Sequence, residues 1–234
     1  MFIYAHRGAS ALAPENTLLA LRTAISQQAD GIEFDVFQHQ NEFILIHDRW
    51  LHRTTNGIGN IDSLLLEQIR KLDAGAGETV PTLFEALQCI GPSCQINIEL
   101  KGVRDVPLLL RYVQDACKTL SIPRTHILYS SFDHHLLKAI KAISKNTRIG
   151  ALTANKPLDY ARFAEDLQAE FINADVTFVD KNFVYDAKQR GLKMGVYTVD
   201  QPEDLLRLKS WGVDAVFCNN PLNARLALAD LTSD

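Results

Sequence analysis

The sequence predicts a single (β/α)8 barrel, because the pattern, number and total length of its predicted elements agree with that fold. Short apolar runs rich in β-branched residues alternate with amphipathic helical patterns along nearly the whole chain. This alternation is typical of a parallel sheet whose strands are joined by crossover helices. Eight such units within 234 residues favour a TIM barrel. A doubly wound open sheet is the alternative architecture.

The predicted strands are short and mainly apolar, and they are Phe2–Ala5, Ile32–Val36, Gln95–Leu100, His126–Ser130, Thr147–Ala151, Glu170–Ala174, Lys193–Thr198 and Asp214–Cys218. The helices predicted between them carry apolar residues every three or four positions, and they are Asn16–Gln28, Pro81–Leu87, Val106–Leu120, His134–Ser144, Asp180–Arg190 and Pro202–Trp211. Asp133 is a typical N-cap, and Gly191 and Gly212 are typical residues after a helix end.

The alternation of predicted strands and helices is interrupted once, between the second strand and the helix that begins near Pro81. This stretch contains an extra strand at Phe43–Ile46, a glycine-rich turn at Asn56–Asn60 and a short helix at Ser63–Leu72. We therefore expect one domain over residues 1–234, with an insertion of approximately residues 38–80. On a barrel such an insertion lies over the C-terminal face, where the active site is built.

Composition and charge narrow the class of protein. The chain is 47% hydrophobic and 22% charged, which is ordinary for a globular domain. Its formal net charge is −4, so it lacks the net positive charge that is typical of nucleic-acid-binding proteins. No apolar stretch approaches the roughly 20 residues that span a bilayer. The four cysteines lack zinc spacing, and no leader-like segment follows Met1, so we expect a cytoplasmic location if Met1 is the natural start. Oligomeric state is not readable from the composition.

The most informative segment is Ile32–Val36. Side chains alternate across a strand, so Glu33 and Asp35 point to one side while Ile32, Phe34 and Val36 point to the other. Two neighbouring carboxylates in an apolar setting are costly unless a cation neutralises them or a pKa shifts. The pair therefore predicts a metal site or acid–base chemistry, with a solvent-facing edge strand as the structural alternative.

Other polar groups occur at the ends of neighbouring strands. The first strand ends in His6 and Arg7, the third carries Glu99 and Lys101 on one face, and the extra strand is followed by His47. Ion pairs of Arg7 with Glu15 and of Lys101 with Glu99 would be a purely structural interpretation. Because all these groups fall at C-terminal strand ends or in the insertion, we expect them to converge on one site.

The residue types indicate a particular chemistry. Carboxylate oxygens without thiolates suit a hard divalent cation, with Mg²⁺ or Ca²⁺ ahead of Zn²⁺ and with Mn²⁺ as a further candidate. A cation beside arginine and lysine favours an anion with dispersed charge, most simply phosphate. Two histidines on opposite sides of a phosphorus atom could supply the acid and the base for a displacement. The sequence has no Walker-type loop or dinucleotide glycine pattern.

With these residues in place, the chain resembles the glycerophosphodiester phosphodiesterase family. The resemblance runs in order along nearly the whole chain, and its segments are Ala5–Ser10, Ala13–Thr17, Gly31–Val36, His47–Asp48, Arg53–Gly57, Pro81–Leu83, Ile98–Lys101, Val196–Asp200, Gly212–Val216 and Asn220–Pro221. Each segment is a weak signal, but the ordered set is specific. It implies a TIM barrel with a small insertion after the second strand.

The resemblance also implies roles for individual residues. The cation would be held by Glu33, Asp35 and Glu99, and the general acid and base would be His6 and His47, in an order that the sequence does not settle. The residues that contact phosphate or substrate would be Arg7, Lys101, Asn16 and Tyr197. Members of the family hydrolyse glycerophosphodiesters, such as glycerophosphocholine or glycerophosphoethanolamine, to glycerol 3-phosphate and an alcohol. The expected partner is thus a small molecule, with no nucleic acid and no stable membrane insertion.

Two departures from the family pattern concern the end of the chain. Tyr197 stands where the family commonly has tryptophan, which keeps an aromatic wall but adds a hydroxyl that needs a partner. The segment Cys218–Pro221 differs from the commoner acidic version. Headgroup preference would depend on the loops after the later strands, where the candidate contacts are Phe132, Asn155, Asp175 and Tyr197.

Three alternative functions are also considered. A hydrolase of lysophospholipids or other phosphodiesters on the same scaffold would need an exposed apolar lip, for which the candidates are Trp50, Leu51, Leu64, Leu65 and Leu66. A non-catalytic binding barrel would keep the metal and lose turnover. A sugar-phosphate isomerase or a glycosidase is a third reading, although neighbours on one strand such as Glu33 and Asp35 do not flank a scissile glycosidic bond. A cyclic phosphate intermediate and direct attack by water both fit the residues.

Overall fold

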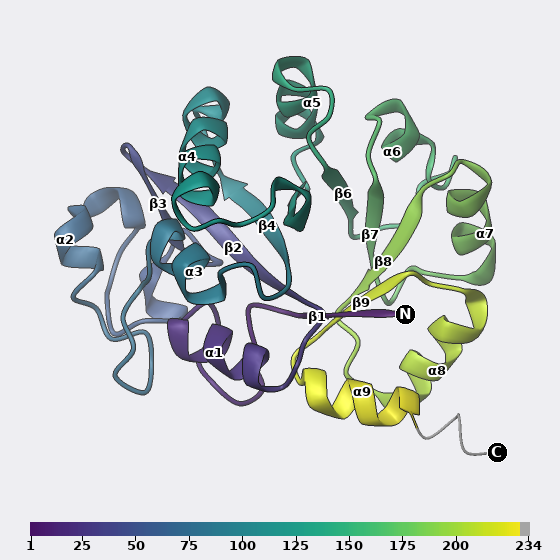
Figure 1. Cartoon of the computed structure of the whole chain (residues 1–234), viewed down its shortest axis with the longest axis horizontal. Coiled ribbons are helices and arrows are strands. Elements are labelled where there is room, and N and C mark those ends of the chain that lie inside the picture. Colours follow the sequence, from purple (N-terminus) through teal and green to yellow (C-terminus); the bar gives the residue numbers. More distant parts are fainter. Residues whose placement is uncertain (230–234) are drawn as a thin grey trace.

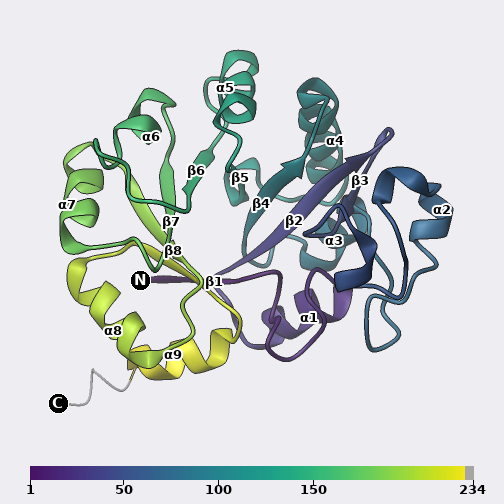
Figure 2. The same cartoon turned by 180° about the vertical axis from the view of Figure 1, so that it is seen from behind.

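Eight parallel strands close into a barrel in the computed structural model, which describes residues 1–229. The barrel closes because β1 (Phe2–Ala5) pairs with both β2 (Gly31–His39) and β9 (Ala215–Cys218). The helices lie outside the strands, as Figures 1 and 2 show from opposite sides. The predicted TIM barrel is confirmed, and the open-sheet alternative is wrong.

The remaining barrel strands agree with the predicted ones to within a few residues, and they are β4 (Gln95–Gly102), β5 (Ile127–Ser131), β6 (Ile149–Thr153), β7 (Phe171–Asp175) and β8 (Lys193–Tyr197). β2 is longer than predicted. Its last residues, Val36–His39, pair antiparallel with β3 (Glu42–Leu45), so the second strand runs on into a hairpin above the barrel. The alternation of apolar and polar residues stops before this extension, which explains why the sequence pattern did not reveal it.

Most helices were also predicted, and these are α1 (Leu18–Ser26), α3 (Leu83–Ile90), α4 (Val106–Thr119), α5 (His134–Ile143), α7 (Lys181–Gln189) and α8 (Pro202–Trp211). Local chemistry sets their ends. Asp133 accepts from the backbone N–H groups of His135 and Leu136 at the start of α5, and Gly212 follows α8 in a left-handed conformation with φ of 79°.

Three helical predictions need correction. The sequence missed α6 (Arg162–Asp166), which is too short to show a period, and α9 (Pro221–Ala229), whose apolar residues are spread around the helix. The helix predicted over Ser63–Leu72 is only one turn, α2 (Leu66–Ile69), because Ile61–Ser63 forms a separate 3-10 turn. No helix among residues 1–229 is long and apolar enough to cross a membrane.

The segment between β3 and α3 has a small apolar core of its own, built from Ile44, Ile46, Leu51, Ile61, Ile69 and Val80. Leu64 and Leu66 pack against this core. Of the residues considered for an apolar lip, only Trp50 and Leu65 are exposed. Most leucines of this segment are therefore packed in or against its own core. This packing argues against an exposed apolar lip for lipid substrates.

Candidate active site

Three carboxylates meet at the C-terminal end of the barrel. Glu33 and Asp35 lie on β2, and Glu99 lies beside Asp35 on the neighbouring strand β4. One oxygen from each of the three groups lies within 4.8 Å of the others, and their exposed fractions are only 2%, 0% and 8%. The structure thus brings together the side chains that alternation had placed on one face.

The electrostatics of this cluster are those of buried like charges. Burial, with the neighbouring charges of Asp35 and Glu99, raises the pKa of Glu33 well above its ordinary value. Burial and the charge of Asp35 raise the pKa of Glu99 to about 7. Lys101 Nζ contacts the Glu99 carboxylate and lies 3.4 Å from Asp35 Oδ1, while Arg7 Nε lies 3.3 Å from Asp35 Oδ2. These two cations offset part of the repulsion.

The donor set fits a divalent metal ion. Glu33 Oε1 is buried without a hydrogen-bond partner, which is costly for a carboxylate unless a cation faces it. All three candidate ligands offer hard oxygen atoms, and thiolates are absent from the described group, so Mg²⁺, Ca²⁺ and Mn²⁺ suit it best. The ion pairs of Arg7 with Glu15 and of Lys101 with Glu99, the basis of the structural alternative, are both present but leave Glu33 Oε1 unpaired.

The loop after β1 orients these carboxylates. Arg7 donates its backbone N–H to Glu33 Oε2 at 2.8 Å. Asn16 Nδ2 donates to Asp35 Oδ2 at 2.9 Å, and Asn16 Oδ1 accepts the backbone N–H of Asp35 at 3.0 Å. Both ends of the Asn16 amide therefore bind Asp35. Gly8 has a φ of 78°, and a Cβ there would lie 2.7 Å from Ala20, so this close turn requires glycine. Asn16 is buried behind Asp35 and does not line the main cavity.

His6 is held by a chain of hydrogen bonds that ends at a carboxylate. Its Nδ1 lies 2.9 Å from Asn219 Oδ1, and Asn219 donates from Nδ2 to Asp200 Oδ2 at 2.6 Å. Ser10 Oγ donates to the same Asn219 oxygen at 2.7 Å. Since Nδ2 must face the carboxylate, Oδ1 faces His6, and His6 Nδ1 must carry the proton. The Nε2 atom of the neutral imidazole is therefore a lone-pair acceptor.

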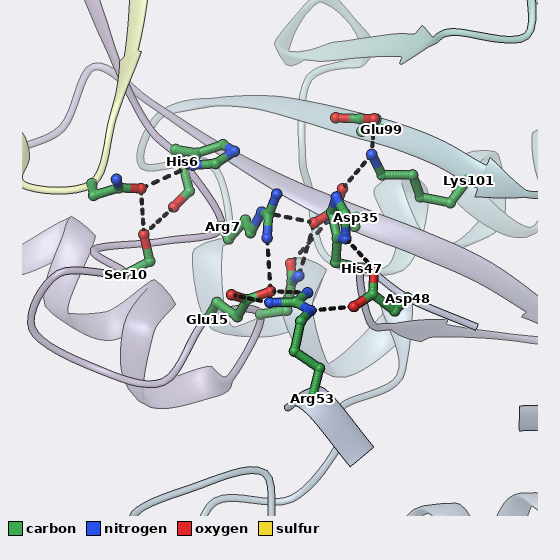
Figure 3. A network of polar contacts seen from close by, with 12 residues as sticks. His6, Arg7, Ser10, Glu15, Asp35, His47, Asp48, Arg53, Glu99 and Lys101 are labelled. Atoms are coloured by element: carbon green, nitrogen blue, oxygen red, sulfur yellow. Dashed lines mark hydrogen bonds and ion pairs between the residues drawn. The ribbon is translucent and has the colours of Figure 1, made fainter. Parts of the chain in front are cut away.

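His47 has a different partner. Its Nδ1 lies 2.6 Å from Asp48 Oδ1, and Asp48 also contacts Arg53. Arg53 in turn binds both oxygens of Glu15, at 3.0 and 2.8 Å, and Glu15 pairs with Arg7. Figure 3 shows this network running from the loop after β1 to the segment after β3. Asp48 gives His47 an anionic partner that stabilises its protonated form, whereas the hydrogen-bond partner of His6 is a neutral amide.

Sequence reasoning did not assign a role to the supporting residues Ser10, Glu15, Asp48, Arg53, Asp200 and Asn219. All of these except Asn219 lie in segments that carry the family resemblance, so a signal for them was available. Asn219 and Asp200 lie far along the chain from His6, and only the closure of the barrel brings them to it.

The two histidines, the two cationic side chains and the carboxylates of Glu33 and Glu99 line one cavity of about 390 Å³. Its polar wall comes from the early strands and the segment after β3, and contains His6, Arg7, Glu33, His47, Asn97, Glu99 and Lys101. Its other wall comes from the later strands and contains Phe132, Leu152, Asp175, Val176, Thr177, Tyr197, Thr198 and Phe217. Most predicted site residues line this cavity, whereas Asp35 and Asn16 lie buried outside its lining and the predicted contact Asn155 is exposed and does not line it.

A barrel that carries an acidic triad, two histidines and two cationic side chains at its C-terminal end is built to act on phosphate esters, so the fold and the site define a TIM-barrel phosphodiesterase. Comparison with known proteins agrees and is more specific. The model of the glycerophosphoryl diester phosphodiesterase family matches residues 6–223. The chain belongs to this family, whose members are phosphoric diester hydrolases.

Relatives match the chain over nearly its full length. A glycerophosphodiester phosphodiesterase from Caldanaerobacter subterraneus is 34% identical, with 94% of each chain covered. One from Bacillus subtilis is 30% identical over 93% of this chain and 83% of its own. Among solved structures, a phosphodiesterase from Oleispira antarctica in complex with the product sn-glycerol-3-phosphate superimposes with a TM-score of 0.89 at 30% identity, covering 98% of this chain and 97% of the other.

Proposed function

We infer that this enzyme hydrolyses glycerophosphodiesters to glycerol 3-phosphate and an alcohol, in a reaction that requires one divalent cation. The observation that carries the proposal is the buried triad Glu33, Asp35 and Glu99, of which Glu33 and Glu99 line the same cavity as two histidines and two cationic side chains. The Oleispira relative, crystallised with sn-glycerol-3-phosphate, supports the nature of the product. The proposal includes the small-molecule substrate and the cytoplasmic location that the sequence predicts.

The polar wall divides into binding and catalytic groups. Arg7 and Lys101 would bind the phosphate oxygens, since both are cations held beside the carboxylate cluster in the cavity wall. Glu33, Asp35 and Glu99 would hold the cation, which supplies charge neutralisation for the phosphate and lowers the pKa of a hydroxyl bound to it. Asn16 orients Asp35 and so acts on the site through another residue.

His6 is the proposed general base. Burial and the neighbouring Arg7 charge lower the pKa of His6, so the imidazole is neutral near pH 7. The hydrogen bond to Asn219 leaves the Nε2 lone pair available to accept a proton from the attacking hydroxyl, whether that hydroxyl belongs to water or to the glycerol.

His47 is the proposed general acid. Burial, with the charges of Lys101 and Arg7, lowers its pKa, and Asp35 and the hydrogen-bonded Asp48 offset part of this shift. Because Asp48 lies 2.6 Å from Nδ1, the imidazolium has a direct counter-charge that His6 lacks. His47 can therefore carry a proton into the reaction and donate it from Nε2 to the leaving alcohol oxygen.

Replacing Asn219 with alanine tests the positioning of His6. We expect kcat to fall about 10- to 100-fold, the range for losing a group that orients a catalytic side chain, with KM little changed. The hydrogen bond to Asn219 raises the pKa of His6, so its loss should move the acidic limb of the kcat/KM profile to lower pH. Steady-state kinetics from pH 5 to 8 measure both effects.

The matched control is Asn223→Ala, an exposed position near the start of α9. It should leave both kcat and the pH profile unchanged. An Asn219→Ala variant with unaltered kcat and an unmoved acidic limb would show that the Asp200–Asn219–His6 chain has no part in catalysis.

The proposed function is tested by measuring release of glycerol 3-phosphate from glycerophosphocholine and glycerophosphoethanolamine. The protein is first stripped of metal and then supplied with Mg²⁺, Ca²⁺ or Mn²⁺ in turn. We expect no turnover without metal and recovered turnover with at least one of the three cations. Full activity after exhaustive chelation would contradict the metal requirement, and inactivity with every cation would contradict the substrate class.

A further inference from the structure

The wall of the cavity opposite the carboxylates carries a second group of residues that the reaction chemistry does not use. Phe132 follows β5, Asp175 ends β7 and Tyr197 ends β8. Asp175 and Tyr197 are register partners on adjacent strands, so their side chains emerge side by side. All three line the same cavity as the phosphate-binding groups.

The two aromatic rings form a fixed corner. Their centroids lie 6.1 Å apart with an interplanar angle of 87°, an edge-to-face arrangement. The Tyr197 hydroxyl donates to the Thr153 carbonyl at 2.9 Å, which holds the ring in place and occupies its donor. Lys101 Nζ lies over the Phe132 ring, 5.4 Å from its centroid, so Phe132 contacts both the proposed phosphate-binding lysine and Tyr197.

Asp175 supplies a negative charge beside this corner. Its Oδ1 accepts the backbone N–H of Thr177 at 2.8 Å, which orients the carboxylate. Its Oδ2 has no hydrogen-bond or ion-pair partner among residues 1–229. Among the described residues that line the cavity, Asp175 is the acidic one outside the metal-binding triad. The two walls therefore have opposite characters, with Arg7 and Lys101 on one side and a free carboxylate among aromatic rings on the other.

We propose that Phe132, Tyr197 and Asp175 form a subsite for the alkylammonium part of the leaving alcohol, as found in choline and ethanolamine headgroups. The inference rests on the proposed function and names the substrate class of the same site. A quaternary or primary ammonium is attracted by aromatic faces and by a nearby carboxylate. A zwitterionic glycerophosphodiester matches the two walls, because its phosphate meets the cations and its ammonium meets Asp175. A polyol headgroup could donate to Asp175, but it carries no charge to pair with the carboxylate and gains no cation–π attraction from the rings.

The test compares Asp175→Asn with the wild type on three substrates in the metal-loaded enzyme: glycerophosphocholine, glycerophosphoethanolamine and the uncharged-headgroup substrate glycerophosphoglycerol. Asparagine keeps the shape and the acceptor for Thr177 N–H but removes the charge. We expect kcat/KM for the two ammonium substrates to fall about tenfold, mainly through KM, with less than a twofold change for glycerophosphoglycerol. Retained activity on glycerophosphoglycerol shows that the variant is folded. Asp159→Asn, an exposed carboxylate in the loop after β6, is the matched control.

A second measurement uses the wild-type enzyme alone. Choline should inhibit glycerophosphoglycerol hydrolysis competitively, whereas its uncharged isostere 3,3-dimethyl-1-butanol should inhibit at least fivefold less. Equal inhibition by the two, or equal losses on all three substrates in Asp175→Asn, would overturn the subsite. A larger loss on glycerophosphoglycerol would instead assign Asp175 to hydroxyl recognition and overturn it as well. A wild type that releases glycerol 3-phosphate from none of the three would overturn the proposed function, which is a distinct result.

Discussion

Replacing Glu33 with glutamine should lower metal-supported kcat by about 10³-fold or more, because the change removes one of three anionic ligands and with it several kcal/mol of charge stabilisation. Glutamine keeps the shape of the side chain and the acceptor for the Arg7 backbone N–H. The stability of the fold should not decrease. The pKa of Glu33 is raised by burial and by the charges of Asp35 and Glu99, so a neutral amide at this position should not destabilise the metal-free protein.

Two measurements check this expectation. Release of glycerol 3-phosphate at saturating Mg²⁺, Ca²⁺ or Mn²⁺ gives the kinetic effect, and thermal unfolding in a chelator gives the stability of the metal-free form. Glu67→Gln, an exposed glutamate on α2, is the matched control and should change neither. A Glu33→Gln enzyme within tenfold of wild-type kcat would remove Glu33 from the metal site.

Removing His6 or His47 should each lower kcat by about 10²- to 10⁴-fold with natural substrates, the usual contribution of a positioned acid or base. The two roles separate when the leaving group no longer needs a proton. With a p-nitrophenyl ester of glycerol 3-phosphate, His47→Ala should recover to within about tenfold of the wild type, because p-nitrophenolate leaves unaided. His6→Ala should stay as impaired as before, since the attacking hydroxyl still has to lose its proton.

Parallel kinetics on glycerophosphocholine and on the p-nitrophenyl ester give the comparison directly. His135→Ala, an exposed histidine at the start of α5, controls for loss of an imidazole elsewhere. Recovery of His6→Ala instead of His47→Ala would exchange the two assignments. A loss of threefold or less in both variants would show that neither histidine is a catalytic acid or base.

The carboxylate cluster shows how far the sequence could be taken. Alternation on one strand placed Glu33 and Asp35 on a common face, and the strand-end position of Glu99 brought it to the same site, because parallel strands place their C-terminal ends together. The same physical rule located His6, Arg7 and Lys101. These rules depend on side-chain alternation and on strand direction. Both can be inferred from residues that are close together in the sequence.

The remaining features depend on contacts that periodicity does not encode. The amide of Asn16 turns inward onto Asp35, although a polar residue at the start of a helix would equally suit a cap. Asn219 reaches His6 only through the pairing of the last strand with the first. α9 has no clear apolar face, so its position on the barrel is decided by packing. Residues that support a site are in this sense harder to predict than those that form it.

The hydrogen bond between His6 and Asn219 ties catalysis to the completion of folding. The histidine that we propose as the general base follows the first strand, and the amide that fixes its tautomer follows the last strand of the barrel. During synthesis the N-terminal strands emerge with the metal ligands and both histidines long before Asn219 exists. A nascent or C-terminally truncated chain therefore holds these groups without the hydrogen bond that we propose orients His6 as a base. On the proposed mechanism, turnover therefore requires a closed barrel.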